Sequence, residues 1–530
     1  MTGERSFGAH SSGEHTVVGQ RVPLWDARSM VEGSSVYTGD LKLPRMLHCG
    51  LRRADVPHAL VTRIDVRKAE QVPGVVAVVT AATAPPSSRH RFGRSLFDRQ
   101  IFASDKVRCI SDVLAAVAAE NDDAAAEAVS LIEVDYEELP AVLSFEQALE
   151  PGAPLVHEGK RHYRAPDFMA AHLVRDDSNL VTEFLLERGD VAAGRQRSAA
   201  VLSRTFSTQR MEHYSMEPHG SVASFEKGAG TLTIWSSTGK PWRLVGDLAS
   251  LLGLPMGSVR LIIPKVGGDF GGKGELTIEP YCGLLSMVTG RPVRGVFSRE
   301  EEFTCSTHKT PFDIDLTMGL DVGGLITFIE ADVRCDTGAY DGFASMVQLH
   351  GAIHLQGPYN VENLRIRGRV AYTNNVASGS FRGFGAPQVT FARESLLDEV
   401  SRVLGIGPFE VRRRNAWREG AVTCTGQILD PLQHSVSVLE TIDGAEQVAS
   451  LRHDGAGRPA AEEGDPPSIR RGIGVATGHH GIGGGIWSGA DTASVILRMS
   501  PDGGVVATLG VCDVGQGAST TIRQLLAEGL

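Results

Sequence analysis

Residues 258–280 read SVRLIIPKVGGDFGGKGELTIEP, an apolar run that changes abruptly into a glycine-rich stretch. Four glycines in the six positions from Gly267 to Gly272 let main-chain amides approach a bound anion, because no Cβ intrudes and positive φ is accessible. Residues 278–288 then have the pattern of a helix that ends at Gly290. The stretch predicts a strand, a glycine loop and a helix, the junction at which α/β folds bind ligands.

Three interpretations of this loop compete. A phosphate loop fits the G-x-x-x-x-G-K spacing up to Lys273, but Gly274 stands where Mg²⁺ chemistry needs a Ser or Thr hydroxyl. A dinucleotide-binding fingerprint is excluded because Asp269 occupies the position of its second glycine. The third interpretation is a tight structural turn without a ligand, and the rest of the chain argues against it.

The composition is that of a globular protein with several domains: 530 residues, 42% hydrophobic and 22% charged. A net charge of −11 argues against a nucleic-acid or anionic-membrane partner, since both need a basic surface. We find neither a signal-peptide core nor a run of about 18 apolar residues, so we expect a cytoplasmic protein without membrane insertion. The seven cysteines are dispersed, which would place any iron–sulfur cluster on another subunit.

The first part of the chain reads as a polar tail followed by a small domain. Residues 1–19 are expected to be disordered, and 20–150 alternate short strands and helices as in a small α/β domain. Within that domain, residues 84–99 contain two consecutive prolines and several basic residues, which predicts an exposed loop. Residues 150–170 are expected to form a linker.

The second part carries longer elements. Residues 170–440 form the next predicted domain, with amphipathic helices near 244–252 and 396–404 that are stopped by glycines. A second linker is expected over residues 454–468, which are rich in Pro, Gly and acids. Residues 470–530 then begin a further domain with strands at 494–499 and 505–511. One hairpin and the start of a helix cannot close a core, so we expect this domain to be incomplete.

Two further glycine clusters each precede an apparent helix. Residues 380–388 read SFRGFGAPQ and place the fork of Arg382 beside a helix N-terminus, which suits an anion. Residues 513–517 read DVGQG and offer a side-chain amide among exposed main-chain amides. Taken singly, each cluster is more often a structural turn.

Taken in order, the three clusters resemble those of the molybdopterin-binding large subunit of the xanthine dehydrogenase/aldehyde oxidase family, the molybdenum hydroxylases. The likeness covers about residues 18–530 and extends to the flanking stretches MEPHG at 216–220, DTGAY at 336–340 and YEELP at 136–140. It implies an α+β (mixed α/β) fold, in which a small hammerhead-like α/β domain precedes molybdopterin-binding α+β domains, the last of them incomplete.

The resemblance also implies roles for particular residues. The main chain at Phe270 and Gly271 would approach the molybdenum ligands, Arg382 would contact the pterin, and Gly515 and Gln516 would bind the cofactor phosphate. Phe384 resembles the aromatic residue that stacks on a flat substrate, and His350 aligns with an arginine that binds purines in xanthine-type members. The cofactor would be molybdenum–molybdopterin, in its cytosine dinucleotide form in a bacterial protein, with iron–sulfur and FAD centres only on partner subunits.

The chain departs from the family pattern at three places. Gly239 replaces a common Gln, which puts ordinary molybdenum ligation in doubt, and Gly274 replaces the purine-binding Glu of xanthine-type members, with Glu275 one position later. Xanthine is therefore not the expected substrate. No residue can be assigned as the family's general-base Glu, and Glu212 and Glu217 are expected to be solvated surface acids.

Two functions follow from this pattern. The first is a subunit of a molybdenum hydroxylase that oxidises an aldehyde or an N-heterocycle with water as oxygen donor. Its partners would be an iron–sulfur small subunit, an FAD-binding medium subunit and a chain supplying the missing C-terminal half. The alternative is an inactive fragment or a non-catalytic scaffold that binds partners.

Overall fold

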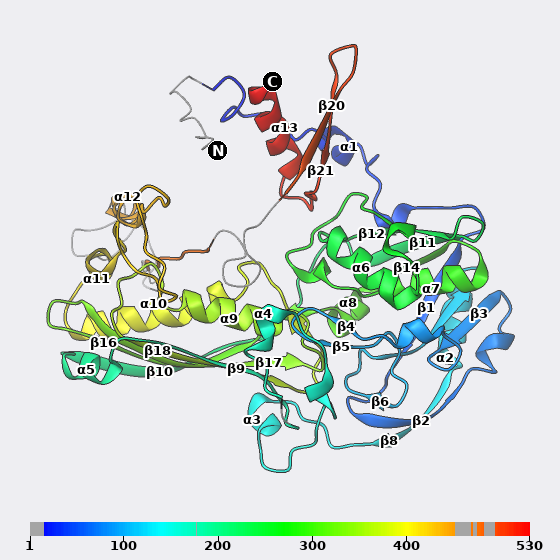
Figure 1. Ribbon diagram of the computed structural model, residues 1–530, viewed down its shortest axis with the longest axis horizontal. Coiled ribbons are helices and arrows are strands. Elements are labelled where there is room, and N and C mark those ends of the chain that lie inside the picture. Colours follow the sequence, from blue (N-terminus) through cyan, green and yellow to red (C-terminus); the bar gives the residue numbers. More distant parts are fainter. Residues whose placement is uncertain (1–14, 176, 451–467, 470–473, 482–492) are drawn as a thin grey trace, which may run out of the picture.

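The computed structural model describes residues 15–175, 177–450, 468–469, 474–481 and 493–530 (Figure 1). A seven-stranded and a five-stranded sheet form its two main bodies, and a β-hairpin followed by a helix projects from them. No helix among these residues is long and apolar enough to cross a membrane. The expected linker at 454–468 lies almost entirely outside the described residues, as does most of the expected disordered tail.

The seven-stranded sheet joins the N-terminal region to the central one, because β1 pairs in parallel with β14. Helix α7 packs on one face of this sheet, and α2 covers the N-terminal strands from the other face. Strand β7, which lies between β1 and the edge strand β3, is buried at every residue. In spatial order the strands are β13 (Val259–Ile262), β12 (Thr231–Ser236), β11 (Gly220–Glu226), β14 (Val293–Val296), β1 (Leu47–Arg53), β7 (Val113–Ala119) and β3 (Val75–Thr80).

The five-stranded sheet has one apolar and one charged face. Along β16, buried positions alternate with half-buried ones, as expected when one face packs against helices. Helices α9 (Ala344–His354) and α10 (Ala386–Val403) cover the apolar face (Figure 1), and the other face carries ion pairs such as Arg334 with Asp315. In spatial order the strands are β10 (Ala200–Thr208), β16 (Phe312–Leu320), β17 (Ile326–Gly338), β18 (Leu364–Tyr372) and β9 (Leu180–Arg188).

The helices expected from apolar spacing are present and end at the expected glycines. Helix α6 (Pro241–Leu252) is followed by Gly253 and α7 (Glu279–Thr289) by Gly290, both in the left-handed region. Helix α2 spans Asp122–Ser130 in the N-terminal domain. The remaining helices are α1 (Ala27–Val31), α3 (Phe145–Ala148), α4 (Asp167–Ala170), α5 (Val191–Gln196), α8 (Arg299–Cys305), α11 (Pro408–Asn415) and α12 (Val438–Ser450).

Three further short pieces of sheet lie outside the two main sheets. A three-stranded sheet consists of β6 (Lys106–Val107), β2 (Ala59–Asp65) and β8 (Glu133–Glu138). β15 (His308–Lys309) pairs with β19 (Ser378–Gly379), and β4 (Phe92–Gly93) pairs with β5 (Phe97–Arg99).

Two segments expected at the surface are packed inside. Residues 84–99 include the β4–β5 hairpin, in which Asp98 is buried and accepts hydrogen bonds from the Asp341 amide and the Tyr372 hydroxyl. Arg91 lies over Tyr163, Arg99 lies over Tyr340 and Arg94 pairs with Asp247. These contacts explain why a basic segment can be packed inside. The expected linker at 150–170 is likewise folded, and its residues Val156, His157, Lys160 and Met169 are buried.

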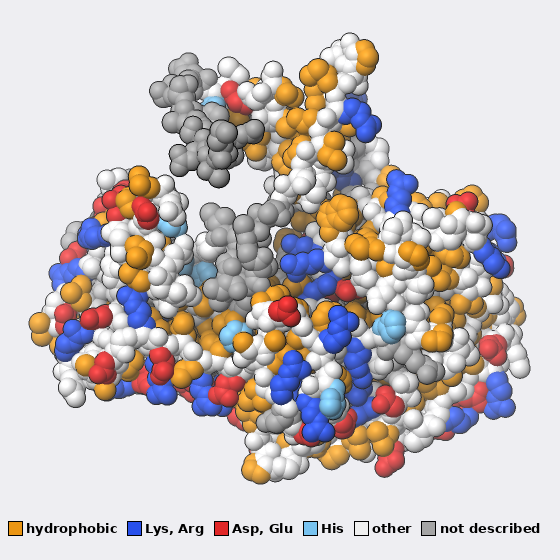
Figure 2. All heavy atoms as spheres, in the orientation of Figure 1, with side chains coloured by type: hydrophobic (Ala, Val, Ile, Leu, Met, Phe, Trp, Pro, Cys, Tyr) orange, Lys and Arg blue, Asp and Glu red, His pale blue; other side chains and the backbone are white. Residues whose placement is uncertain are grey.

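The C-terminal elements agree with the sequence in kind. Strands β20 (Val495–Met499) and β21 (Val505–Leu509) form the expected hairpin, and α13 (Ala518–Gly529) follows it. Their apolar side chains are exposed along the projecting hairpin (Figure 2). The amides of Val17 and Val18 donate to the Glu528 carboxylate, so this part of the N-terminal segment lies against α13.

Candidate functional site

The three glycine clusters line one cleft of about 1600 Å³. Residues 266–271 come from the loop after β13, 380–384 from the turn before α10, and 510–516 from the turn before α13. Lys and Arg side chains gather on the body beneath the projecting hairpin (Figure 2). All seven residues that the sequence singled out lie in or next to this cleft, although they are dispersed along the chain.

Strained residues concentrate in the cleft wall. Among the described residues, Tyr214, Phe270 and Phe384 are three of the four non-glycine residues with positive φ, at 55°, 53° and 49°. All three line the cleft. Such backbone costs about 1–3 kcal/mol per residue and is found mainly where a ligand is held. The strain therefore argues against a merely structural turn.

The first two loops are joined directly. The Arg382 amide donates to the Phe270 carbonyl at 2.9 Å. A Cβ on Gly271 would lie 2.7 Å from Ser380 Oγ, and Gly271 has a φ of +104°. Glycine is thus required there both for the backbone conformation and for the close approach of the two loops.

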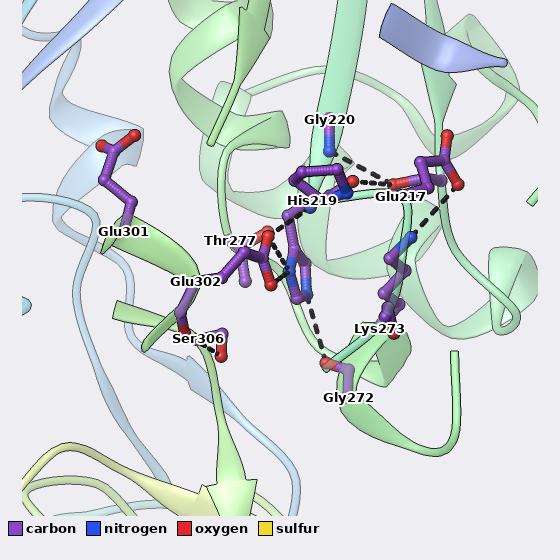
Figure 3. Close-up of polar contacts among 12 residues, drawn as sticks. Glu217, His219, Gly220, Gly272, Lys273, Thr277, Glu301, Glu302 and Ser306 are labelled. Atoms are coloured by element: carbon purple, nitrogen blue, oxygen red, sulfur yellow. Dashed lines mark hydrogen bonds and ion pairs between the residues drawn. The ribbon is translucent and has the colours of Figure 1, made fainter. Parts of the chain in front are cut away.

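Two ion pairs that are largely buried contact the glycine loop and hold it in place (Figure 3). Lys273 Nζ lies 3.1 Å from Glu217 Oε2, and the same carboxylate oxygen accepts the Gly267 amide at 2.7 Å. Lys273 is 1% exposed and Glu217 11%, so the expectation that Glu217 is a solvated surface acid was wrong. Burial lowers the pKa of Lys273 and the charge of Glu217 opposes that shift. Lys273 is thus part of the loop's support and does not face the cleft.

The second pair is His219 with Glu302, at 2.9 Å from Nδ1 to Oε1. His219 Nε2 faces the Gly272 carbonyl at 3.3 Å, so the pair reaches the far end of the glycine loop (Figure 3). Burial disfavours the charged imidazole, but the hydrogen bond and charge of Glu302 outweigh burial, and the pKa of His219 is raised. The signal for both supports was the MEPHG stretch, which the sequence flagged only as a flanking likeness.

Arg382 is the exposed cation of the second loop. Its side chain is exposed in the cleft wall and has no ion pair among the described residues. The third loop behaves differently, because the amides of Gly515, Gly517 and Ser519 donate to the Asp513 carboxylate. Gln516 is bonded within its own loop. The amides expected to bind a phosphate there are thus occupied by Asp513 in this conformation.

Phe384 and His350 are in contact, as expected for residues of one pocket. Their rings are 5.4 Å apart in an edge-on arrangement. Phe384 lines the cleft, whereas His350 on α9 lines a second cavity. Glu275 lies elsewhere: a Cβ on Gly342 would come within 2.3 Å of its carboxylate, which is buried beside Arg94 and Arg99 rather than in the cleft.

The structure explains why residue 239 is glycine. A Cβ at this position would lie 2.4 Å from Asp269 Oδ2 and 3.1 Å from Val514 Cγ1. Any larger residue would have to displace the carboxylate that accepts the Gly271 amide at 2.6 Å. A side chain at residue 239 is therefore incompatible with the observed position of the Asp269 carboxylate.

The site suits a large anionic cofactor: it combines a wide cleft, strained glycine loops, an unpaired guanidinium and an aromatic ring. The fold and site together define a cofactor-binding subunit of mixed α/β architecture. Residues 174–416 and 449–530 match the family described as "Molybdopterin cofactor-binding domain". Residues 32–140 match "Aldehyde oxidase and xanthine dehydrogenase, a/b hammerhead domain".

Individual relatives agree. The nicotinate dehydrogenase large molybdopterin subunit of Eubacterium barkeri is 34% identical over 436 residues, which cover 82% of this chain and 97% of that protein. A probable xanthine dehydrogenase subunit of Bacillus subtilis is 34% identical over 506 residues, covering 95% of this chain and 63% of that protein. Quinoline 2-oxidoreductase from Pseudomonas putida 86 is structurally similar, with a TM-score of 0.82, 28% identity, and coverage of 97% of this chain and 65% of that one.

The chain therefore belongs to the xanthine dehydrogenase/aldehyde oxidase family of molybdopterin-binding subunits, as its glycine clusters indicated. Members of this family are subunits of molybdenum-dependent oxidoreductases. The chain spans less than two thirds of the Bacillus and Pseudomonas relatives, but nearly all of the Eubacterium subunit.

Proposed function

We propose that the chain is the cofactor-binding subunit of a molybdenum hydroxylase that oxidises an aldehyde or an N-heterocycle with water as oxygen donor. The observation that carries this proposal is the convergence of the three glycine loops on one cleft beside Phe384. The names of the relatives, which refer to nicotinate, xanthine and quinoline, favour the N-heterocycle. Glu275 points away from the cleft, which disfavours purine recognition by that acid.

When bound, molybdopterin supplies the oxygen-transfer and electron-accepting chemistry. The chain's own residues would bind and orient the cofactor: the main chain at Phe270 and Gly271 would hold its metal end, and Arg382 would offset negative charge on the pterin. Gly515 and Gln516 would hold its phosphate, which requires the Asp513 carboxylate to release the Gly515 amide. Phe384 offers a ring face to a flat substrate. We assign no general base to this chain.

Partner subunits complete the enzyme in this proposal. All seven cysteines are free and most are buried. The described residues contain no group of three or more metal-ligating side chains, so iron–sulfur and FAD centres are assigned to a small and a medium subunit. A further chain supplies the C-terminal half. Support for it comes from the Eubacterium subunit, which is matched over 97% of its length and so ends within the length of this chain. The exposed apolar strands β20 and β21 form a two-stranded sheet, and such a partner can add strands at its edges (Figure 2). We further propose a cytoplasmic location and, for a bacterial source, the cytosine dinucleotide form of the cofactor.

Co-expression tests the proposal. The chain purified alone should contain little molybdenum and have no hydroxylase activity, whereas co-expression with a chain resembling the unmatched part of the relatives should restore both. Iron–sulfur and flavin subunits should co-purify with the assembly. Stoichiometric molybdenum with turnover in the isolated chain would contradict the need for a further chain, and an iron–sulfur spectrum from the isolated chain would contradict the assignment of clusters.

A non-catalytic scaffold is the alternative, and the exposed hairpin is the observation that favours it. An assembly that forms with its partners but contains no molybdenum and oxidises neither aldehydes nor N-heterocycles would support the scaffold. Reading frames adjacent to the gene give a cheaper indication, because an enzyme requires one that resembles the unmatched part of the relatives.

A further inference from the structure

Four imidazole rings stack next to the cofactor cleft. His350 and His354 on α9 have ring centroids 4.1 Å apart, His354 lies 4.7 Å from His479, and His350 lies 4.8 Å from His480. The two pairs are more than one hundred residues apart in the chain. The rings line a cavity of about 1370 Å³, which we call the imidazole cavity.

The imidazole cavity has histidines but no permanently charged side chain. Among the described residues that line it, none is Asp, Glu, Lys or Arg, while His434 adds a fifth imidazole. The Cys424 thiol in its wall is neutral, because burial raises its pKa to about 12. The imidazoles are therefore the groups through which this cavity can acquire a charge near neutral pH.

Among the described residues, Arg188 donates to the Val422 and Thr423 carbonyls behind the wall. The charged side chains under His354 and Thr477 balance one another. Arg393 on α10 donates to the His354 and Thr477 carbonyls and is paired with Glu394. Glu394 is also paired with Arg412, which in turn pairs with Asp398. Two cations and two carboxylates thus form a neutral buried cluster under the cavity. No carboxylate of this cluster is left over to accept a hydrogen bond from an imidazolium.

The four rings differ in whether their nitrogens are hydrogen-bonded. His354 is fully bonded, since Nδ1 donates to the His350 carbonyl and Nε2 accepts the Gly481 amide. His480 Nδ1 donates to the Gly481 carbonyl. In contrast, Nδ1 of His350 and Nδ1 of His479 are buried without a hydrogen-bond partner among the described residues, and His350 as a whole is 9% exposed. Both of these ring nitrogens can therefore form a hydrogen bond with a bound ligand.

Both of these imidazoles are neutral near neutral pH. Burial is the main cause, and the neighbouring histidines add to it, so the pKa of His350 and that of His479 each fall to about 3. An anion placed beside either ring would oppose burial and favour the protonated form. The cavity can thus take up a proton together with an anion.

We propose that the imidazole cavity binds the carboxylate of an anionic aromatic substrate, with one imidazole taking up a proton as the carboxylate binds. The proposal rests on the proposed function, because the cavity adjoins the cofactor cleft at the Phe384–His350 contact. Because the Phe384 and His350 rings are 5.4 Å apart, a substituent on a flat ring stacked on Phe384 can reach His350. The volume fits an aromatic acid better than a single small ion, and the Trp417 ring, 5.0 Å from His479, adds an apolar wall. A metal ion is a poorer occupant, because the described residues contain no group of three or more His, Cys, Asp or Glu placed to hold one.

Calorimetry on the full 530-residue chain tests this directly, with benzoate as the probe and benzamide as its neutral isostere. Benzoate should bind at least tenfold more tightly than benzamide at about pH 6. Titrations in two buffers of different ionisation enthalpy should show uptake of about one proton per benzoate. Linkage then makes benzoate affinity fall by about tenfold between about pH 6 and about pH 7.

Variants locate the site. His350→Gln and His479→Gln, on separate segments, should each weaken benzoate binding at least tenfold and leave benzamide binding unchanged. His172→Gln is the matched control, because that imidazole is also partly buried, with a lowered pKa, but lies against Phe184 outside the cavity. Equal affinity for the two probes, absence of benzoate binding, absence of proton uptake, or unchanged binding in both variants would each overturn the proposal.

Turnover in the assembled complex separates this proposal from the enzymatic one. If the cavity recognises substrate, kcat/KM for an N-heteroaromatic carboxylate should exceed that for its amide, and His479→Gln should remove the difference mainly through KM. Proton-coupled benzoate binding without any turnover would support the cavity and count against the hydroxylase. Turnover with no preference for the carboxylate would do the reverse.

Discussion

The carboxylate of Glu217 joins the two ends of the glycine loop, because it binds Lys273 Nζ at 3.1 Å and the Gly267 amide at 2.7 Å. The loop can therefore hold Phe270 in strained backbone without collapsing. The same carboxylate also accepts the Thr38 amide, so the N-terminal segment is tied to the loop.

Replacing this carboxylate should destabilise the fold. Glu217→Gln leaves the buried ammonium of Lys273 unpaired, and removal of one partner of a buried pair costs about 3–5 kcal/mol. We expect a lower urea midpoint, followed by circular dichroism, and partial recovery in Glu217→Gln/Lys273→Met, which removes both charges. Glu226→Gln, at an exposed strand end, is the control. A midpoint like that of the unchanged protein would show that the pair does not support the loop.

Arg382 should determine cofactor retention, whereas Lys273 should not. Arg382 is exposed in the cleft and unpaired among the described residues, and a charge-assisted hydrogen bond contributes about 1.5–3 kcal/mol. Arg382→Ala should therefore lower pterin occupancy of the assembled complex about tenfold or more. Lys273→Met should lower stability but change pterin affinity little, and Arg402→Ala, also exposed, should change neither. The measurement is the amount of pterin released per folded protein. Equal losses from Arg382→Ala and Lys273→Met would show that the anion site is not on the Arg382 loop.

Gly239 and Asp269 should be energetically coupled. In Gly239→Gln the new Cβ would lie 2.4 Å from Asp269 Oδ2. Because this clash must be relieved by displacing atoms, the substitution should lower the urea midpoint. In Gly239→Gln/Asp269→Gly the clash with the carboxylate is removed, and only the 3.1 Å approach to Val514 Cγ1 remains. The double variant should therefore be more stable than the sum of the two single effects predicts. A double-mutant cycle should give a coupling energy of about 1–3 kcal/mol. Additive effects would mean that the two positions vary independently.

The His219–Glu302 pair should stabilise the fold most in mildly acidic solution. The pKa of His219 is raised, so its contribution is complete below the ordinary value of 6.5 and is lost as pH rises through the raised value. Burial raises the pKa of Glu302, but the hydrogen bond and charge of His219 outweigh it, so that contribution is present above 4.5 and is lost as pH falls through the lowered value.

The stability difference between the unchanged protein and Glu302→Gln should accordingly be largest between about pH 4.5 and about pH 6.5 and shrink toward about pH 9. Urea titrations at several pH values measure it. Glu300→Gln, which is exposed on the same helix, should show no such dependence. A difference that grows with rising pH would contradict the charged state assigned to His219.

Short-range signals in the sequence predicted much of the secondary structure. The apolar spacing of α6 and the glycine after it are local features, and so are the β20–β21 hairpin and the glycine after α7. The same kind of signal misled at residues 84–99 and 150–170. Prolines and basic side chains are typical of surface segments, but here rings and buried carbonyls accept the cationic side chains.

The sequence by itself determined the family and the residues of the cleft, because the order of three glycine clusters is a specific pattern that survives without any contact information. Only the tertiary structure decided how these residues are supported and what lies beside them. Glu217 and Lys273 are 56 residues apart, and His350 and His480 are brought together from distant segments. Which of many acids and histidines meet in the interior depends on how the sheets and helices pack, and that packing alone makes an acid expected in solvent a buried partner of Lys273.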